Sequence, residues 1–297
     1  MKHLPGSPRK TIILLGATGS GKSLISSILT KLPKSVVLDE NYLPPYLAHL
    51  KGFLGDDKDI YKFSTGLRSH INNVLSYGHN GRLSISLQCI QGKISLTEWL
   101  SSLHKKTRTI DTVILESHFF SLVPNVLLDA YPDAKFILLV REGRDVADWL
   151  EREFKALSDE DLVRSDSSEF FFTRTFNGYT VPWWVKHSDE KFFLKLSPFL
   201  RCVYFWNVLN ERLWTFQMSM SESNFLVLKY EFMVQNAMKT RELLINFLDI
   251  NGNLLKPRLF NKFNLTHISQ ASRSRLPTEL LLAEEIAHTM LTSYDYL

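Results

Sequence analysis

The hydrophobic positions of this chain gather in five short runs, most of them followed by a segment with helical spacing. Each run is continuous instead of alternating with polar residues, which is typical of strands covered by helices on both faces. The runs lie at residues 11–15, 35–38, 112–115, 134–140 and 224–229. Apolar residues at helical spacing lie at 24–32, 122–131, 145–157, 197–220, 240–248 and 277–291. This alternation predicts a three-layer α/β fold with a central parallel sheet of about five strands.

The length of 297 residues suits one α/β domain with insertions, so we expect residues 1–297 to form a single domain. Two insertions, 44–108 and 158–190, lack a clear strand pattern, and we expect them to form a helical cap. Helical spacing recurs in the first insertion at 67–75 and 96–103. Aromatic residues at 170–172 and 183–184 in the second fit either core packing of the cap or a surface that stacks on a ligand.

Composition and charge narrow the classes of partner. The net charge of +4 and the pI near 8.9 favour anionic ligands only mildly. No stripe of Lys and Arg with interleaved aromatic residues is present, so we expect no nucleic-acid partner. Cys89 and Cys202 are the only cysteines, which indicates a reducing, cytoplasmic location. No apolar run is long enough to span a bilayer, so we expect no membrane association.

The first apolar run leads directly into a glycine-rich loop. Residues 16–23 read Gly-Ala-Thr-Gly-Ser-Gly-Lys-Ser and match the pattern G-x-x-x-x-G-K-[ST] in full, between a predicted strand and a predicted helix. Small residues let successive backbone N–H groups turn toward one anion, and the helix N-terminus adds positive potential there. The loop therefore predicts a phosphate site. ATP, GTP and a phosphosulfate donor all fit it.

Four further stretches carry a resemblance to a known family. Residues 116–124 read ESHFFSLVP, and residues 131–147 read YPDAKFILLVREGRDVA. FLVLKYE follows at 225–231 and RSRLP at 273–277. In this order they resemble the sulfotransferases that use 3′-phosphoadenosine 5′-phosphosulfate (PAPS). The resemblance extends from residue 16 to the end of the chain. It implies a P-loop sulfotransferase fold and transfer of a sulfuryl group to a hydroxyl or amine of a small molecule.

The resemblance also implies a cofactor site. The glycine-rich loop would hold the 5′-phosphosulfate through Thr18, Gly19, Ser20, Gly21, Lys22 and Ser23. Arg141 would bind the 3′-phosphate, and Tyr230 would lie near the adenine. The family usually has a serine as a second 3′-phosphate ligand, and this chain has Trp149 there. Arg273 and Arg275 in the tail are candidates to compensate. The product would be 3′-phosphoadenosine 5′-phosphate.

Catalytic roles follow from the same resemblance. His118 falls where cytosolic members of the family carry their catalytic base, and a near-neutral pKa suits a histidine for that role. Glu40 is the other candidate base, since a carboxylate follows the second strand in some members. Lys22 would stabilise charge on the bridging oxygen, because the family's basic loop residue is shifted to this position. Direct transfer of this kind needs no metal, so we expect none.

The carboxylate of Glu116, near the place where the acceptor is expected to bind, departs from the family pattern. Glu116 stands where the family usually has a lysine, and it cannot help to hold a sulfate. With Asp39 and Glu40 it would make a cluster of negative charge. This cluster suggests a cationic or amine-bearing natural product as the acceptor. The candidate substrate-binding residues are Glu40, Glu116 and His118.

Two other interpretations stay open. The complete loop motif is typical of P-loop kinases, with Glu116 and Ser23 on Mg²⁺ and Asp39 as the base for a small-molecule substrate. Alternatively, two departures from the family pattern, Gly19 in place of the usual basic residue and Trp149 in place of the usual serine, belong to a protein that binds a nucleotide without catalysing transfer.

Overall fold

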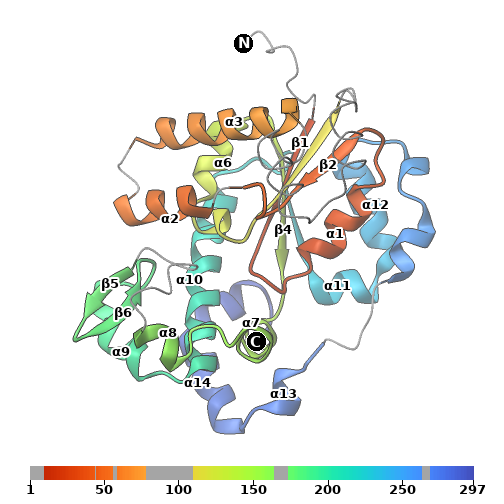
Figure 1. The fold of residues 1–297 in the computed structure, drawn as a ribbon. Coiled ribbons are helices and arrows are strands. Elements are labelled where there is room, and N and C mark those ends of the chain that lie inside the picture. The colour runs from red at the N-terminus through yellow and green to blue at the C-terminus, as the bar shows by residue number, and fades with distance from the viewer. Residues whose placement is uncertain (1–9, 44, 56–58, 78–109, 164–172, 263–267) are drawn as a thin grey trace, which may run out of the picture.

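A five-stranded parallel sheet forms the centre of the computed structural model, which describes residues 10–43, 45–55, 59–77, 110–163, 173–262 and 268–297 (Figure 1). Its strands are β1 (Lys10–Leu15), β2 (Ser35–Leu38), β3 (Thr112–Glu116), β4 (Lys135–Val140) and β7 (Phe225–Lys229). They pair in the order β2-β3-β1-β4-β7. Each begins and ends within a residue of its apolar run, so the predicted fold class is confirmed.

Helices cover both faces of this sheet, as the continuous apolar runs predict. Successive residues of β1 point to opposite faces: Ile12 and Leu14 join one buried cluster, and Ile13 and Leu15 join the other. The first face is covered by α1 (Lys22–Leu29), α11 (Tyr230–Gln235) and α12 (Ala237–Leu248). The second is covered by α3 (Ile60–Tyr77), α6 (Pro124–Ala130), α7 (Gly143–Phe154), α10 (Pro198–Met218) and α14 (Pro277–Ser293).

The expected cap insertions contain both helix and strand. Helical spacing at 67–75 is confirmed in α3, whereas 96–103 lies outside the described residues. The second insertion holds an antiparallel hairpin, β5 (Thr173–Phe176) with β6 (Tyr179–Pro182), which the sequence pattern did not indicate. The remaining elements are α2 (Pro45–Leu54), η1 (Phe120–Leu122), α8 (Asp159–Val163), η2 (His187–Asp189), α9 (Glu190–Lys195), η3 (Gly252–Leu254), η4 (Pro257–Lys262) and α13 (Ala271–Ser274).

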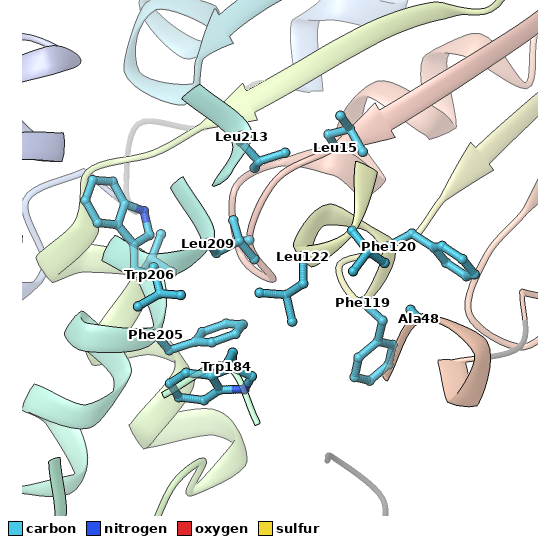
Figure 2. Close-up of a cluster of buried hydrophobic side chains, with 14 of the residues drawn as sticks. Leu15, Ala48, Phe119, Phe120, Leu122, Trp184, Phe205, Trp206, Leu209 and Leu213 are labelled. Atoms are coloured by element: carbon cyan, nitrogen blue, oxygen red, sulfur yellow. The ribbon is translucent and has the colours of Figure 1, made fainter. Parts of the chain in front are cut away.

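Helix α10 joins the sheet to the hairpin side of the molecule. Figure 2 shows Phe205, Trp206, Leu209 and Leu213 of this helix within one buried cluster that also includes Trp184. The indole N–H of Trp206 donates to the carbonyl of Arg141 at 3.2 Å, directly after β4. The helix therefore fixes the backbone at the carboxyl end of β4.

Arg201 holds the start of α10 to its neighbours from a position that is 3% exposed. Its guanidinium donates to the carbonyls of Leu157, Phe193 and Leu194 at 3.0, 3.4 and 3.1 Å. It also pairs with Asp159 at 2.7 Å. One side chain thereby satisfies three carbonyls at turns and helix ends on the hairpin side.

No helix among the described residues is both long enough and apolar enough to cross a membrane.

We predict that Arg201→Met lowers the free energy of unfolding by about 3 kcal/mol, because it leaves buried carbonyls without a donor. Urea denaturation followed by tryptophan fluorescence measures this loss. Lys191→Met on the exposed side of α9 is the matched control and should change stability by less than about 0.5 kcal/mol. Equal stability of the two variants would contradict the role of Arg201.

Candidate functional site

The phosphate loop connects β1 to the N-terminus of α1 and depends on its glycines. Gly19 and Gly21 have φ angles of +84° and +98°, a region that side chains disfavour. A Cβ atom on Gly19 would lie 2.7 Å from the Trp149 ring, and one on Gly21 would lie 2.9 Å from Tyr230. The loop thus needs glycine both for its turn and for close contact with the two rings.

Lys22 is buried inside this loop. Its Nζ donates to the carbonyls of Gly16 and Ala17, both at 2.8 Å. Burial lowers the pKa of Lys22 to about 8, although the carboxylates of Glu116 and Glu40 oppose this change. The loop therefore holds a cation that is poorly solvated and that would gain from a phosphate oxygen as partner.

A cavity of about 670 Å³ opens at the loop, and several strand ends meet in it. Ser23 Oγ donates to Glu116 Oε1 at 2.9 Å, which joins the start of α1 to the end of β3. Asp39 and Glu40, at the end of β2, line the same cavity. Three carboxylates therefore share the cavity with the Lys22 cation. Among the described residues, no group of His, Cys, Asp and Glu has the arrangement of a complete metal site.

Arg141 and Tyr230 also line this cavity. Arg141 is 4% exposed, donates to the carbonyl of Gly19 at 3.1 Å and lies 3.9 Å from Asp145. Its guanidinium lies over the Tyr230 ring, 5.0 Å from the centroid. Burial raises the pKa of Tyr230, so its hydroxyl stays protonated at neutral pH. A rigid cation and two flat rings, those of Tyr230 and Trp149, thus face the cavity.

The two tail arginines do not reach this cavity. Arg275 donates to Asp148 Oδ1 at 2.7 Å, contacts Glu151 and lies over the Phe199 ring. These contacts attach the tail to α7 and α10. Arg273 is exposed, and neither arginine is among the residues that line the cavity. The structure therefore does not place Arg273 or Arg275 at the cavity, where they were expected to replace the missing 3′-phosphate ligand.

Glu40 and His118 form a close pair at the ends of β2 and β3. Glu40 Oε1 accepts the peptide N–H of His118 at 2.7 Å and also contacts the ring at Nδ1. Burial lowers the pKa of His118, with Lys22 adding to this effect and Glu40 opposing it. Burial alone would raise the pKa of Glu40, but its bonds to His118 and the Lys22 charge hold it below its ordinary value. The two candidate bases thus belong to one hydrogen-bonded unit, with Nε2 as the ring nitrogen that Glu40 leaves available.

A second cavity, of about 700 Å³, meets the phosphate cavity at this pair. Both cavities are lined by Thr18, Glu40, Asn41 and His118. The rest of the second cavity is mainly apolar, and η1, α7, α8, the β5–β6 hairpin and α10 supply its walls, including Phe119, Leu122, Leu150, Phe154, Leu162, Pro182 and Phe205. Glu116 lines the phosphate cavity and not this one.

The structure brings together most residues that the sequence singled out. The phosphate cavity is lined by Thr18, Gly19, Gly21, Lys22, Ser23, Glu40, Glu116, His118, Arg141 and Tyr230. Ser20 is buried within the loop itself. The apolar residues of the second cavity carried no local signal in the sequence, because they come from distant elements and look like ordinary core residues.

The similarity of this chain to known proteins is limited to solved structures. No family model matches the chain, and no curated protein matches it. The solved structures that resemble it are mostly sulfotransferases. The sulfotransferase domain of the Synechococcus PCC 7002 olefin synthase is 15% identical, with 96% of this chain and 95% of that chain covered and a TM-score of 0.49. Mouse sulfotransferase SULT7A1, complexed with PAP, is 12% identical over 94% and 84%, with a TM-score of 0.45.

A sugar kinase from Janibacter sp. HTCC2649 also matches, at 14% identity over 84% of this chain and 99% of that chain, with a TM-score of 0.35. Identities and TM-scores in this range assign no activity to the chain. Its function has to be argued from the site.

We predict that Glu40→Gln lowers the pKa of His118 further, because the carboxylate is the group that raises it against the effect of burial. Titration of the His118 ring by NMR measures the change. Asp39→Asn is the control: it removes a carboxylate of the same cavity that bonds to Asn41, and it should leave the His118 pKa in place. A rise of the His118 pKa in Glu40→Gln would contradict the pairing.

Proposed function

We propose that this chain is a sulfotransferase that moves a sulfuryl group from PAPS to the hydroxyl or amine of a small-molecule acceptor. The observation that carries the proposal is the place of the Glu40–His118 pair, at the junction of a phosphate cavity and an apolar cavity. A base at such a junction can reach a nucleophile on one side and a transferred group on the other. The sequence resemblance described above supports the same activity.

The 5′ end of PAPS fits the residues of the loop. A buried lysine and the backbone N–H groups at the start of α1 suit an anion, and Lys22 can exchange its two carbonyl partners for a phosphate oxygen. The fit at the 3′ end rests on Arg141, since Trp149 offers a ring and no hydroxyl to a phosphate.

Transfer would proceed in one in-line step. The acceptor oxygen or nitrogen bonds to sulfur while the bond from sulfur to the bridging oxygen breaks, and its electron pair stays on the 5′-phosphate of 3′-phosphoadenosine 5′-phosphate. Nε2 of His118 accepts the acceptor's proton, and Glu40 at Nδ1 stabilises the resulting imidazolium. Lys22 and the loop N–H groups offset the charge that develops on the leaving oxygen.

The shape of the second cavity defines the acceptor class further. Its mainly apolar lining suits an aromatic or aliphatic body whose reactive group reaches His118. Two carboxylates, Glu40 and Asp161, also line it, which leaves room for a positive charge on the acceptor. Of the predicted acidic cluster, Glu116 and Asp39 do not line this cavity, whereas Glu40 does and Asp161 joins it. Tyramine and 4-ethylphenol are matched probes with and without that charge.

We predict that 3′-phosphoadenosine 5′-phosphate raises the melting temperature in EDTA, and that His118→Ala keeps this shift while losing transfer. A ligand at about a hundred times its Kd adds about 2.7 kcal/mol of stability. Transfer is measured with PAPS carrying radioactive sulfur and tyramine or 4-ethylphenol as acceptor. Lys22→Ala should lose the shift as well as transfer. No stabilisation by the bisphosphate, with or without Mg²⁺, would refute the proposal.

A Mg²⁺-ATP-dependent small-molecule kinase is the second candidate, and one contact favours it. The bond from Ser23 Oγ to Glu116 Oε1 places a hydroxyl beside a carboxylate, the pair that holds Mg²⁺ in P-loop kinases. ATP carrying radioactive phosphorus at its γ position distinguishes the two activities. Label from ATP on the acceptor, together with stabilisation by ATP only in the presence of Mg²⁺, would establish the kinase.

We predict that Trp149→Ser improves binding of 3′-phosphoadenosine 5′-phosphate by about tenfold, because a hydroxyl bonded to a phosphate replaces the ring. Isothermal titration measures both this ligand and AMP, which lacks the 3′-phosphate. Phe154→Ser is the control, since Phe154 packs edge-on against Trp149. An equal gain in affinity for 3′-phosphoadenosine 5′-phosphate and AMP would contradict a bond from the new hydroxyl to the 3′-phosphate. It would mean that the Trp149 ring only occupies space in the cavity.

A further inference from the structure

Four aromatic side chains contact one another in series and end at the candidate base. They are Trp183, His49, Phe119 and His118, and we call them the column. The indole N–H of Trp183 donates to Nδ1 of His49 at 3.2 Å, and both side chains are buried. The His49 ring meets Phe119 edge-on, with centroids 4.7 Å apart and planes at 70°. Phe119 then packs on His118, with centroids 3.8 Å apart and planes at 38°. The column links the end of the β5–β6 hairpin, helix α2 and the end of β3. Trp183 and His49 take part in no step of the proposed transfer.

The outer end of the column is firmly held. Gly52 of α2 lies against the Trp183 indole, and the space of a Cβ on Gly52 is occupied by that ring. Arg212 of α10 lies over the Trp183 ring at 5.1 Å and donates to the carbonyl of Leu122 at 3.2 Å. Trp183 also directly follows Pro182, which lines the apolar cavity. The wall of the acceptor cavity is thereby connected to the column.

The bond from Trp183 defines the protonation of His49. A ring nitrogen that accepts a hydrogen bond carries no proton, so neutral His49 holds its proton on Nε2. Burial lowers the pKa of His49 to about 4, and the positive charge that His118 can carry adds to this effect. His49 is therefore neutral at neutral pH, where it contributes no charge to the site.

Two restraints are needed to hold an imidazole ring in one orientation. Glu40 restrains Nδ1 of His118, but the Glu40 side chain is 35% exposed and can move together with the ring. Packing of Phe119 on the ring face removes that freedom. Phe119 can do this only while its own position is fixed, which is what His49 and Trp183 provide.

We propose that His49 is a positioning residue for His118, acting through Phe119 and itself oriented by Trp183. The role of His118 in transfer rests on the proposed function, whereas its orientation does not. Among the described residues, the charged groups that act on the column include Glu40 at the end of β2, Lys22 on α1 and Arg212 on α10. His49→Leu leaves all three in place, so a change that it causes at His118 does not come from the loss of one of these charges.

The test measures the His118 ring by NMR in the full-length protein with isotope-labelled histidine, assigned through His118→Gln. We expect His49→Leu to change the ratio of the two His118 tautomers. It should also raise the His118 pKa by about 0.5 unit or more, since a loosened ring gains water. His49→Asn should retain more of the native signals than His49→Leu, because its side-chain oxygen can accept the Trp183 N–H although the ring contact with Phe119 is lost. Trp183→Phe should act like His49→Leu, and it keeps an aromatic ring in case the leucine variant does not fold.

The control is Trp184→Phe, a buried neighbour that packs on Phe193, Tyr204 and Phe205 outside the column. Unchanged His118 signals in both His49→Leu and Trp183→Phe would overturn the proposal, and so would equal changes in Trp184→Phe. If the transfer activity is present, kcat should fall by up to about 100-fold in His49→Leu with an unchanged KM for PAPS. Absence of any transfer in the native protein would refute the proposed function alone, because the NMR result is independent of it.

Discussion

The central place of β1 in the sheet determines which groups can meet in the site. Its neighbours are β3 on one side and β4 on the other, all parallel. The phosphate loop that follows β1 therefore lies between Glu116–His118 at the end of β3 and Arg141 at the end of β4. Moving β1 to an edge would separate these groups. The hydrogen bonds from Ser23 to Glu116 and from Arg141 to Gly19 fasten the loop on both sides.

Burial sets the electrostatic state of the residues that this arrangement gathers. Lys22 and His118 both have lowered pKa values because water is largely excluded around them. The carboxylates at the strand ends offset part of that effect. A lysine with a pKa of about 8 remains mostly charged at neutral pH, whereas His118 is mostly neutral there. One cavity at the strand ends thus holds a buried cation and a neutral imidazole.

The sequence predicted the sheet and the loop because both depend on local pattern. Continuous apolar runs define strands buried on two faces, and a full loop motif needs only eight adjacent residues. The hairpin β5–β6 was missed, since its strands have only four residues each and neither alternates regularly between buried and exposed positions. The column from Trp183 to His118 was also invisible: His49 carries no motif, and its role depends on contacts 134 positions along the chain.

The charge of Glu116 affects the two candidate reactions, sulfuryl transfer from PAPS and phosphoryl transfer from ATP, to different degrees. Glu116 lies in the phosphate cavity and would repel any anionic donor that carries no metal ion. A phosphosulfate carries fewer negative charges than the terminal phosphates of ATP, because its sulfuryl group holds a single charge where a phosphoryl group holds more. Repulsion from one carboxylate is therefore weaker for the sulfuryl donor, and the Lys22 cation can offset it. The triphosphate needs Mg²⁺ between itself and Glu116. The same carboxylate is compatible with sulfuryl transfer when the site is free of metal and with phosphoryl transfer only when the metal is bound.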